Sequence, residues 1–165
     1  MEDCKPVFYT DMRVGKNRMQ YRHLKFRSMK KNAEDKTGPV WSDSKDERVT
    51  ATGKMLRATA MDELPQLVNI LKGDMSFVGP RPERIFFVDK FLKEIPNYEK
   101  RFSIRPGLTG MAQVYGKYDT RPDEKLKWDL EYIEKMNFLL DLKLIFLSFL
   151  VTLRGGWMRF ENRSR

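Results

Sequence analysis

Two segments rich in proline and glycine limit most strongly what this chain can fold into. The first is Gly79-Pro80-Arg81-Pro82, and the second is Arg105-Pro106-Gly107-Leu108-Thr109-Gly110. Neither can be regular helix, because proline lacks the backbone N–H that a helix interior uses and glycine weakens it. The two segments therefore divide the chain into shorter elements and hold Arg81 and Arg105 on restricted backbone.

Hydrophobic periodicity predicts that most of these elements are helices. Residues 48–57 lead into a short helical turn, and residues 62–71 carry one apolar face. Longer helices are predicted over residues 83–92, 123–135 and 138–153.

The N-terminal part of the chain is predicted to form two strands instead of helices. Residues 6–9, a turn at residues 13–15 and a return strand over residues 19–26 predict a β-hairpin. Residues 30–45 are expected to form a loop or a frayed helix, and residues 76–82 cannot be regular helix. We therefore expect an α+β fold, mostly helical with a small N-terminal hairpin, in a single domain spanning residues 1–165.

The charge balance predicts an anionic partner. Thirty-two lysines and arginines against 23 aspartates and glutamates give a net charge of +9. Nucleic acid, a phosphorylated substrate and an anionic membrane surface all fit this charge. The single cysteine, Cys4, excludes an intrachain disulfide, and the single histidine, His23, is read as a surface or structural residue. No apolar stretch reaches the roughly 18–20 residues of a spanning helix.

Asp62 and Glu63 are adjacent carboxylates at the start of a predicted helix. They could cap that helix, with Pro65 in its first turn, or Thr59 and Asp62 could form a capping box. Alternatively, one carboxylate could attack phosphorus while its neighbour binds a divalent metal. These residues alone leave both interpretations open.

Cations also stand on restricted backbone in several segments of the chain. The arginine guanidinium can donate hydrogen bonds to two phosphate oxygens at once. Glycine, which has no side chain, lets backbone amides approach an anion closely. The candidate phosphate-binding residues are Lys25, Arg27, Arg57, Arg81 and Arg105. Helix termination by the prolines is the alternative explanation of their pattern.

Five motifs occur in an order that resembles the bacterial sugar transferase family, the monotopic polyprenyl-phosphate phosphoglycosyl transferases. The similarity runs from about Pro6 to Leu153. The motifs are Lys25-Phe26-Arg27-Ser28-Met29, Asp62-Glu63-Leu64-Pro65-Gln66-Leu67, Leu71-Lys72-Gly73-Asp74-Met75-Ser76, Val78-Gly79-Pro80-Arg81-Pro82-Glu83 and Arg105-Pro106-Gly107-Leu108-Thr109-Gly110.

The resemblance implies a function and roles for the site. Asp62 would attack the β-phosphate of a UDP-sugar, UMP would leave, and polyprenyl (undecaprenyl) phosphate would take the phosphosugar. Glu63 would hold Mg²⁺, and Arg57, Lys25 and Arg81 would neutralise phosphate. This is the first step in making a capsule, exopolysaccharide or O-antigen, at the cytoplasmic face of the bacterial inner membrane.

The chain departs from the family pattern in three places. Met111 stands where tryptophan is common, and Ala60-Met61 stands where Ser-Leu is common. The family's re-entrant membrane helix is expected to be absent ahead of Pro6. Membrane contact is then expected from residues 138–153, followed by Arg154 and Arg159, with a plain core helix as the alternative for the first half of this segment.

Two alternatives remain at this stage: a basic nucleic-acid-binding module, and an inactive scaffold relative of the transferase. No zinc-finger or RNP pattern is present, so no nucleic-acid partner is expected. The sequence leaves open which sugar is transferred and whether the chain forms oligomers.

Overall fold

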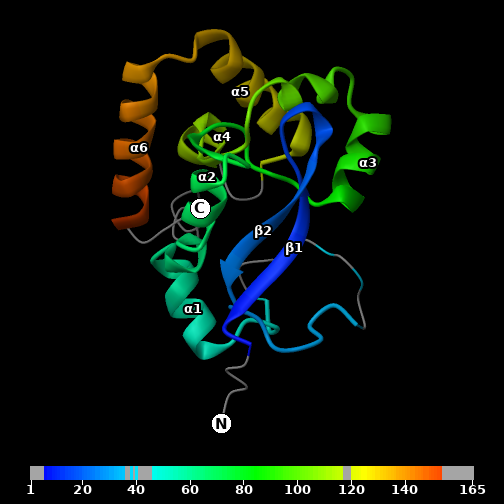
Figure 1. The fold of residues 1–165 in the computed structure, drawn as a ribbon, viewed down its shortest axis with the longest axis vertical. Helices are drawn as coiled ribbons and strands as arrows, with labels where there is room; N and C mark the ends of the chain where they lie inside the picture. The colour runs from blue at the N-terminus through cyan, green and yellow to red at the C-terminus, as the bar shows by residue number, and fades with distance from the viewer. Residues whose placement is uncertain (1–5, 36–37, 39, 41–45, 117–119, 154–165) are drawn as a thin grey trace, which may run out of the picture.

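A long β-hairpin runs through the centre of the molecule in the computed structural model, which describes residues 6–35, 38, 40, 46–116 and 120–153 (Figure 1). Strand β1 (Phe8–Val14) pairs antiparallel with β2 (Gln20–Phe26), and Phe8 lies opposite Phe26. The 3-10 turn η1 (Lys16–Arg18) joins them, with positive φ at Asn17. The predicted hairpin is therefore confirmed.

Helices surround the hairpin and confirm the mostly helical fold class. Helix α3 lies on one side of it, α6 on the opposite side, and α5 crosses one end (Figure 1). In the part of the chain that the structure describes, no helix is long and apolar enough to cross a bilayer. The helices are α1 (Ala51–Ala58), α2 (Gln66–Leu71), α3 (Ile85–Glu94), α4 (Met111–Tyr115), α5 (Pro122–Lys135) and α6 (Phe138–Leu153), with 3-10 turns η2 (Met61–Glu63) and η3 (Tyr98–Ser103).

A second, two-stranded sheet lies next to the two proline-glycine segments and was not predicted from the sequence. Strand β3 (Ser76–Val78) pairs parallel with β4 (Gly107–Thr109), which brings the two proline-glycine segments side by side. A Cβ added to Gly79 would lie 2.5 Å from the Arg105 carbonyl oxygen, so only glycine permits this approach. Strands of three residues are too short to show a period, and their partner is distant in sequence.

Helix α2 corrects the sequence prediction. The helix expected over residues 62–71 is broken into the turn η2 and the shorter α2. The buried residues of α2 are the polar Gln66 and Asn69, whereas Leu71 is 87% exposed. The apolar face of the segment, which also contains Leu67 and Val68, therefore points away from the protein.

Two hydrophobic clusters hold these elements together. One joins β1, α3, η3 and α5 through the buried side chains of Val14, Val88, Phe91, Tyr98, Phe102 and Leu126. The other joins β3, α4, α5 and α6 through Val78, Met111, Tyr132 and Leu144. Of α6 only Leu144 is fully buried, so most of this helix's apolar surface remains uncovered.

Candidate active site

The turn η2 carries the two adjacent carboxylates. Ala60, with φ of 55°, reverses the chain between α1 and η2 and places Asp62 inside, at 7% exposure. The Thr59 hydroxyl donates to carbonyls at the end of α1, and Pro65 stands at the N-cap position of α2. The capping interpretations of Thr59 and Asp62 are therefore wrong.

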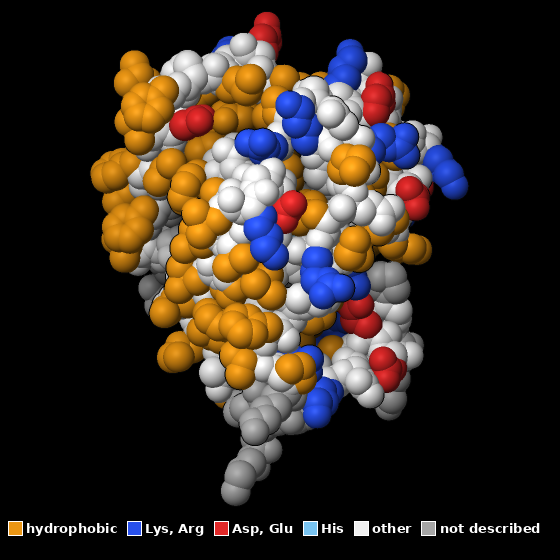
Figure 2. All heavy atoms as spheres, viewed as in Figure 1, with side chains coloured by type: hydrophobic (Ala, Val, Ile, Leu, Met, Phe, Trp, Pro, Cys, Tyr) orange, Lys and Arg blue, Asp and Glu red, His pale blue; other side chains and the backbone are white. Residues whose placement is uncertain are grey.

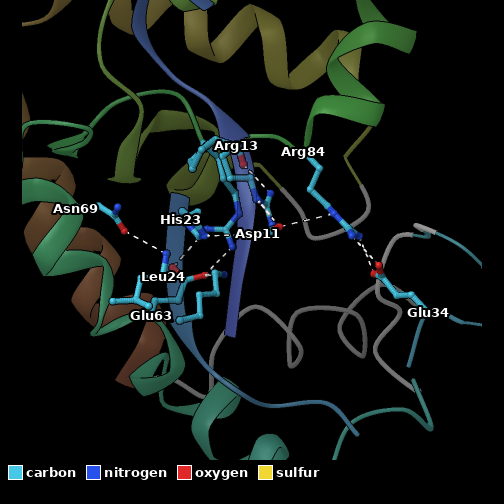
Figure 3. Close-up of polar contacts among 11 residues, drawn as sticks. Asp11, Arg13, His23, Leu24, Glu34, Glu63, Asn69 and Arg84 are labelled. Carbon is cyan, nitrogen blue, oxygen red and sulfur yellow. Dashed lines mark hydrogen bonds and ion pairs between the residues drawn. The ribbon is translucent and has the colours of Figure 1, made fainter. Parts of the chain in front are cut away.

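Glu63 is held by two cations. Its Oε1 accepts from Lys25 Nζ at 2.7 Å and from Arg81 Nη2 at 2.6 Å. Burial alone would raise the pKa of Glu63, but Arg81 and Lys25 bring it well below its usual value. Glu63 is therefore a fixed anion beside β2, in the position shown in Figure 3.

Asp62 differs from its neighbour in its surroundings. Among the described residues none donates a hydrogen bond to its carboxylate. Burial raises the pKa of Asp62, and the charges of Lys25, Arg57 and Arg81 offset this rise only in part. A buried carboxylate without hydrogen bonds is a stronger nucleophile than one that is solvated, because no donor shares its lone pairs.

Arg57 reaches the site because α1 approaches β2 closely. Its Nε donates to Ser28 Oγ at 2.8 Å, and the Thr50 side chain caps α1 at the Gly53 amide. Gly53 is buried against Ser28, and a Cβ there would lie 2.7 Å from the Ser28 carbonyl carbon. Gly53 thus allows α1 to pack closely against Ser28, which brings Arg57 to the site.

We expect Gly53→Ala to lower the free energy of unfolding by about 1–3 kcal/mol, because the new methyl group overlaps the Ser28 backbone. Helix propensity alone predicts the opposite, a gain of about 1 kcal/mol. Urea denaturation measures the change, with Lys54→Ala at an exposed position of α1 as the control. A more stable Gly53→Ala variant would contradict the close approach.

The structure does not join the two remaining predicted cations to the carboxylates. Within the described residues no hydrogen bond or ion pair links Arg27 or Arg105 to Asp62 or Glu63. Arg27 is half-buried after the end of β2, and Arg105 is exposed near Gly73. Their predicted role in binding phosphate remains a prediction.

Sequence reasoning missed the residues that hold the site together. Asn69 Oδ1 accepts from the Leu24 amide at 3.1 Å and its Nδ2 donates to the Arg22 carbonyl at 2.8 Å, which fixes α2 against β2 (Figure 3). Only the polarity of Asn69 within an apolar helix could have indicated this.

His23 is structural, as one of the two interpretations predicted, but it is not on the surface. It is 2% exposed, and its Nδ1 lies 3.5 Å from Asp11 Oδ1. Burial lowers the pKa of His23 to about 4, so the side chain is neutral at physiological pH. Cys4, Arg154 and Arg159 lie outside the described residues.

A buried carboxylate pair among cations, on a small helical domain with an uncovered apolar face, is typical of an enzyme that handles phosphorylated substrates beside an apolar phase. The chain belongs to the bacterial sugar transferase family, whose model matches residues 1–155. The family that the five motifs indicated is therefore confirmed.

Curated relatives support the same family. The chain is 42% identical over 158 residues to the UDP-N-acetylgalactosamine-undecaprenyl-phosphate N-acetylgalactosaminephosphotransferase of Aeromonas hydrophila, covering 94% of this chain and 37% of that protein. It is 39% identical over 165 residues to the galactosyl transferase CpsE of Streptococcus agalactiae, covering 93% and 36%. It is 38% identical over 148 residues to the UDP-glucose:undecaprenyl-phosphate glucose-1-phosphate transferase of Escherichia coli, covering 87% and 32%. The chain thus spans about a third of the length of these three relatives.

Proposed function

We propose that this chain is a catalytic domain that transfers a sugar-1-phosphate from a UDP-sugar to polyprenyl (undecaprenyl) phosphate. The observation that carries the proposal is the Asp62 carboxylate, buried beside Lys25, Arg57 and Arg81. The relatives' names supply the donor and acceptor classes. The product would start a surface polysaccharide such as a capsule, exopolysaccharide or O-antigen.

The reaction proceeds in two displacements at one phosphorus atom. An Asp62 oxygen attacks the β-phosphorus of the UDP-sugar, the bond from this phosphorus to the bridging oxygen breaks, and UMP leaves with the electron pair. A phosphate oxygen of the polyprenyl phosphate then attacks the same phosphorus. The bond to Asp62 breaks, which releases the diphosphate-linked lipid and restores the carboxylate. No proton is gained or lost by Asp62.

The cations serve both displacements. Each substrate brings negative phosphate oxygens next to two carboxylates, and Lys25, Arg57 and Arg81 offset that repulsion. Because the two steps share one phosphorus, one set of cations serves the donor and then the acceptor.

Glu63 is the residue that would hold Mg²⁺. Both of its oxygens face cations, and the described residues contain no cluster of three metal-ligating side chains. This donor set fits an ion bound by a single carboxylate together with substrate phosphates, as Mg²⁺ commonly is. When bound, the ion would neutralise charge on the diphosphate.

Release of UMP tests the proposed function. The purified chain is incubated with Mg²⁺, undecaprenyl phosphate in vesicles, and a panel of UDP-glucose, UDP-galactose and their N-acetylated forms. We expect UMP from at least one donor. No UMP from any donor, together with salt-dependent binding to oligonucleotides, would instead favour the nucleic-acid-binding module.

The uncovered apolar face provides a place for the lipid acceptor. Hydrophobic side chains gather on one side of the molecule, over α6 and the α1–α2 region (Figure 2). Exposed lysines stand on or next to the same elements, at Lys54, Lys72 and Lys143. We propose that this face lies on an anionic membrane surface, at the cytoplasmic side of the inner membrane where nucleotide sugars are available. The exposed apolar residues are Met55, Met61, Leu64, Leu67, Val68, Leu71, Phe138, Leu139, Leu142, Ile145, Phe146, Phe149 and Leu153.

We expect Leu71→Glu to weaken binding to anionic vesicles by about tenfold or more, because burying one leucine contributes about 1.5–3 kcal/mol. Leu71 is the most exposed large apolar residue on this face, so the thermal midpoint should stay unchanged. Vesicle cosedimentation measures the binding. The control is Phe86→Glu on α3, which is 56% exposed on a helix away from this face. Equal losses in both variants would contradict the proposed face.

A further inference from the structure

The loop that carries Arg81 is held by its backbone carbonyls. Pro80 and Pro82 have no N–H, so this segment has few donors of its own. Four successive carbonyls accept hydrogen bonds from four donors, which lie in β1, η3 and β4. Gly107 N donates to Pro80 O at 2.9 Å, Arg101 Nη2 to Arg81 O at 2.8 Å, Arg13 Nη1 to Pro82 O at 2.9 Å and Val14 N to Glu83 O at 3.2 Å.

Two of these donors are arginine side chains, each paired with a carboxylate. Arg13 Nε lies 2.9 Å from Asp11 Oδ2, near the tip of the hairpin (Figure 3). Arg101 Nη2 lies 2.8 Å from Asp129 Oδ2 on α5. Of the two, Arg101 is the one that bonds to Arg81 itself.

Arg101 is held through its two terminal guanidinium nitrogens, whereas its buried Nε has no hydrogen-bond partner among the described residues. Arg101 is 5% exposed and Asp129 is 3% exposed. Its Nη1 donates to the Tyr98 hydroxyl, and its guanidinium lies 5.0 Å from the centre of the Tyr98 ring. Burial raises the pKa of Asp129 to about 6, so the carboxylate is ionised at neutral pH. Arg101 therefore meets Arg81 in a single geometry.

This ion pair is costly for stability alone. Removing two charges from water costs several kcal/mol each, and well-packed apolar residues often stabilise a core as well or better. The planar guanidinium offers what an apolar residue cannot, since its Nη2 contacts both the Asp129 carboxylate and the Arg81 carbonyl while its Nη1 donates to the Tyr98 hydroxyl. The Arg101–Asp129 ion pair thus couples the position of the Arg81 backbone to the position of α5.

We propose that Arg101, held by Asp129, is a positioning residue that sets the Arg81 backbone so that the Arg81 guanidinium meets Glu63 and the substrate phosphate. Its effect on turnover rests on the proposed function. Its effect on the geometry of Arg81 does not.

A double-mutant cycle tests the effect on turnover. Arg101→Lys keeps the positive charge but loses the planar, forked set of guanidinium N–H donors. We expect this change to lower UMP release by about tenfold to a hundredfold in the wild-type background. In the Arg81→Ala background the same change should alter the rate less than about twofold, because the residue through which Arg101 acts is gone. All rates are measured where melts show each variant fully folded. An equal fall in both backgrounds, or no fall in either, would overturn the proposal.

A second measurement does not need activity. The guanidinium ¹⁵N signals of Arg81, identified by their loss in Arg81→Ala, should exchange slowly with water in the wild-type protein. In Arg101→Lys and in Asp129→Asn they should broaden or exchange rapidly. Lys135→Ala, which removes an exposed ion pair with Glu131 at the far end of α5, should leave them unchanged. Unchanged Arg81 signals in Arg101→Lys would refute the positioning role, whereas a wild-type protein that releases no UMP would refute only the proposed function.

Discussion

Replacing Asp62 by asparagine abolishes transfer, with a loss of at least about a thousandfold in UMP release. The amide cannot supply the anionic oxygen that forms the bond to phosphorus. Mass spectrometry should find a phosphosugar on Asp62 in the wild-type protein when the acceptor is omitted, and none on the variant. Asp89→Asn, at an exposed position of α3, is the matched control and should retain full activity.

The same variant should be at least as stable as the wild type. Burial raises the folded-state pKa of Asp62 above its ordinary value, so the ionised form present at neutral pH is disfavoured in the folded protein. A neutral asparagine removes that cost, and thermal melts at pH 7 should show an equal or higher midpoint. Activity retained together with a lower midpoint would contradict the nucleophile and restore a structural role.

Arg81→Ala should reduce turnover by about a hundredfold to a thousandfold, since one lost cation at the developing phosphate charge costs about 2.7–4 kcal/mol. The stability should change by about 1 kcal/mol or less. The Arg81 side chain is 42% exposed, and Lys25 still neutralises Glu63 when Arg81 is removed. Steady-state rates and urea denaturation of the same preparation separate the two effects.

Arg84→Ala is the control for this variant. Arg84 is three residues further along the chain, but its guanidinium binds Glu34 at 2.6 Å on the far side of the hairpin from Glu63 (Figure 3). Its removal should leave turnover near the wild-type value. Wild-type turnover in Arg81→Ala would remove Arg81 from the site, and equal losses in both variants would point to the shared loop instead.

Local sequence patterns predicted most of the elements correctly. The hairpin and the helices α3, α5 and α6 depend on alternation, periodicity and turn residues, all of which act over a few neighbouring positions. Local signals also indicated the candidate site, because Asp62 and Glu63 are adjacent and Arg81 lies in a segment marked by two prolines. Lys25 and Arg57 were chosen from their motifs, and the structure places both beside the carboxylates.

Contacts between distant segments had no signature in the sequence. Strands β3 and β4 are too short to show a period, and nothing marks Arg101 and Asp129 as partners of each other or of Arg81. The burial of Asn69 likewise depends on an exposed edge of β2 that exists only after the hairpin has packed.

The sequence by itself determined which residues are candidates for the chemistry and that residues 62–71 have an apolar face. Only the tertiary structure decided that this face points outward while Gln66 and Asn69 point inward. The physical reason is that periodicity reports an apolar stripe but not its surroundings, and a protein core and a lipid surface favour the same side chains.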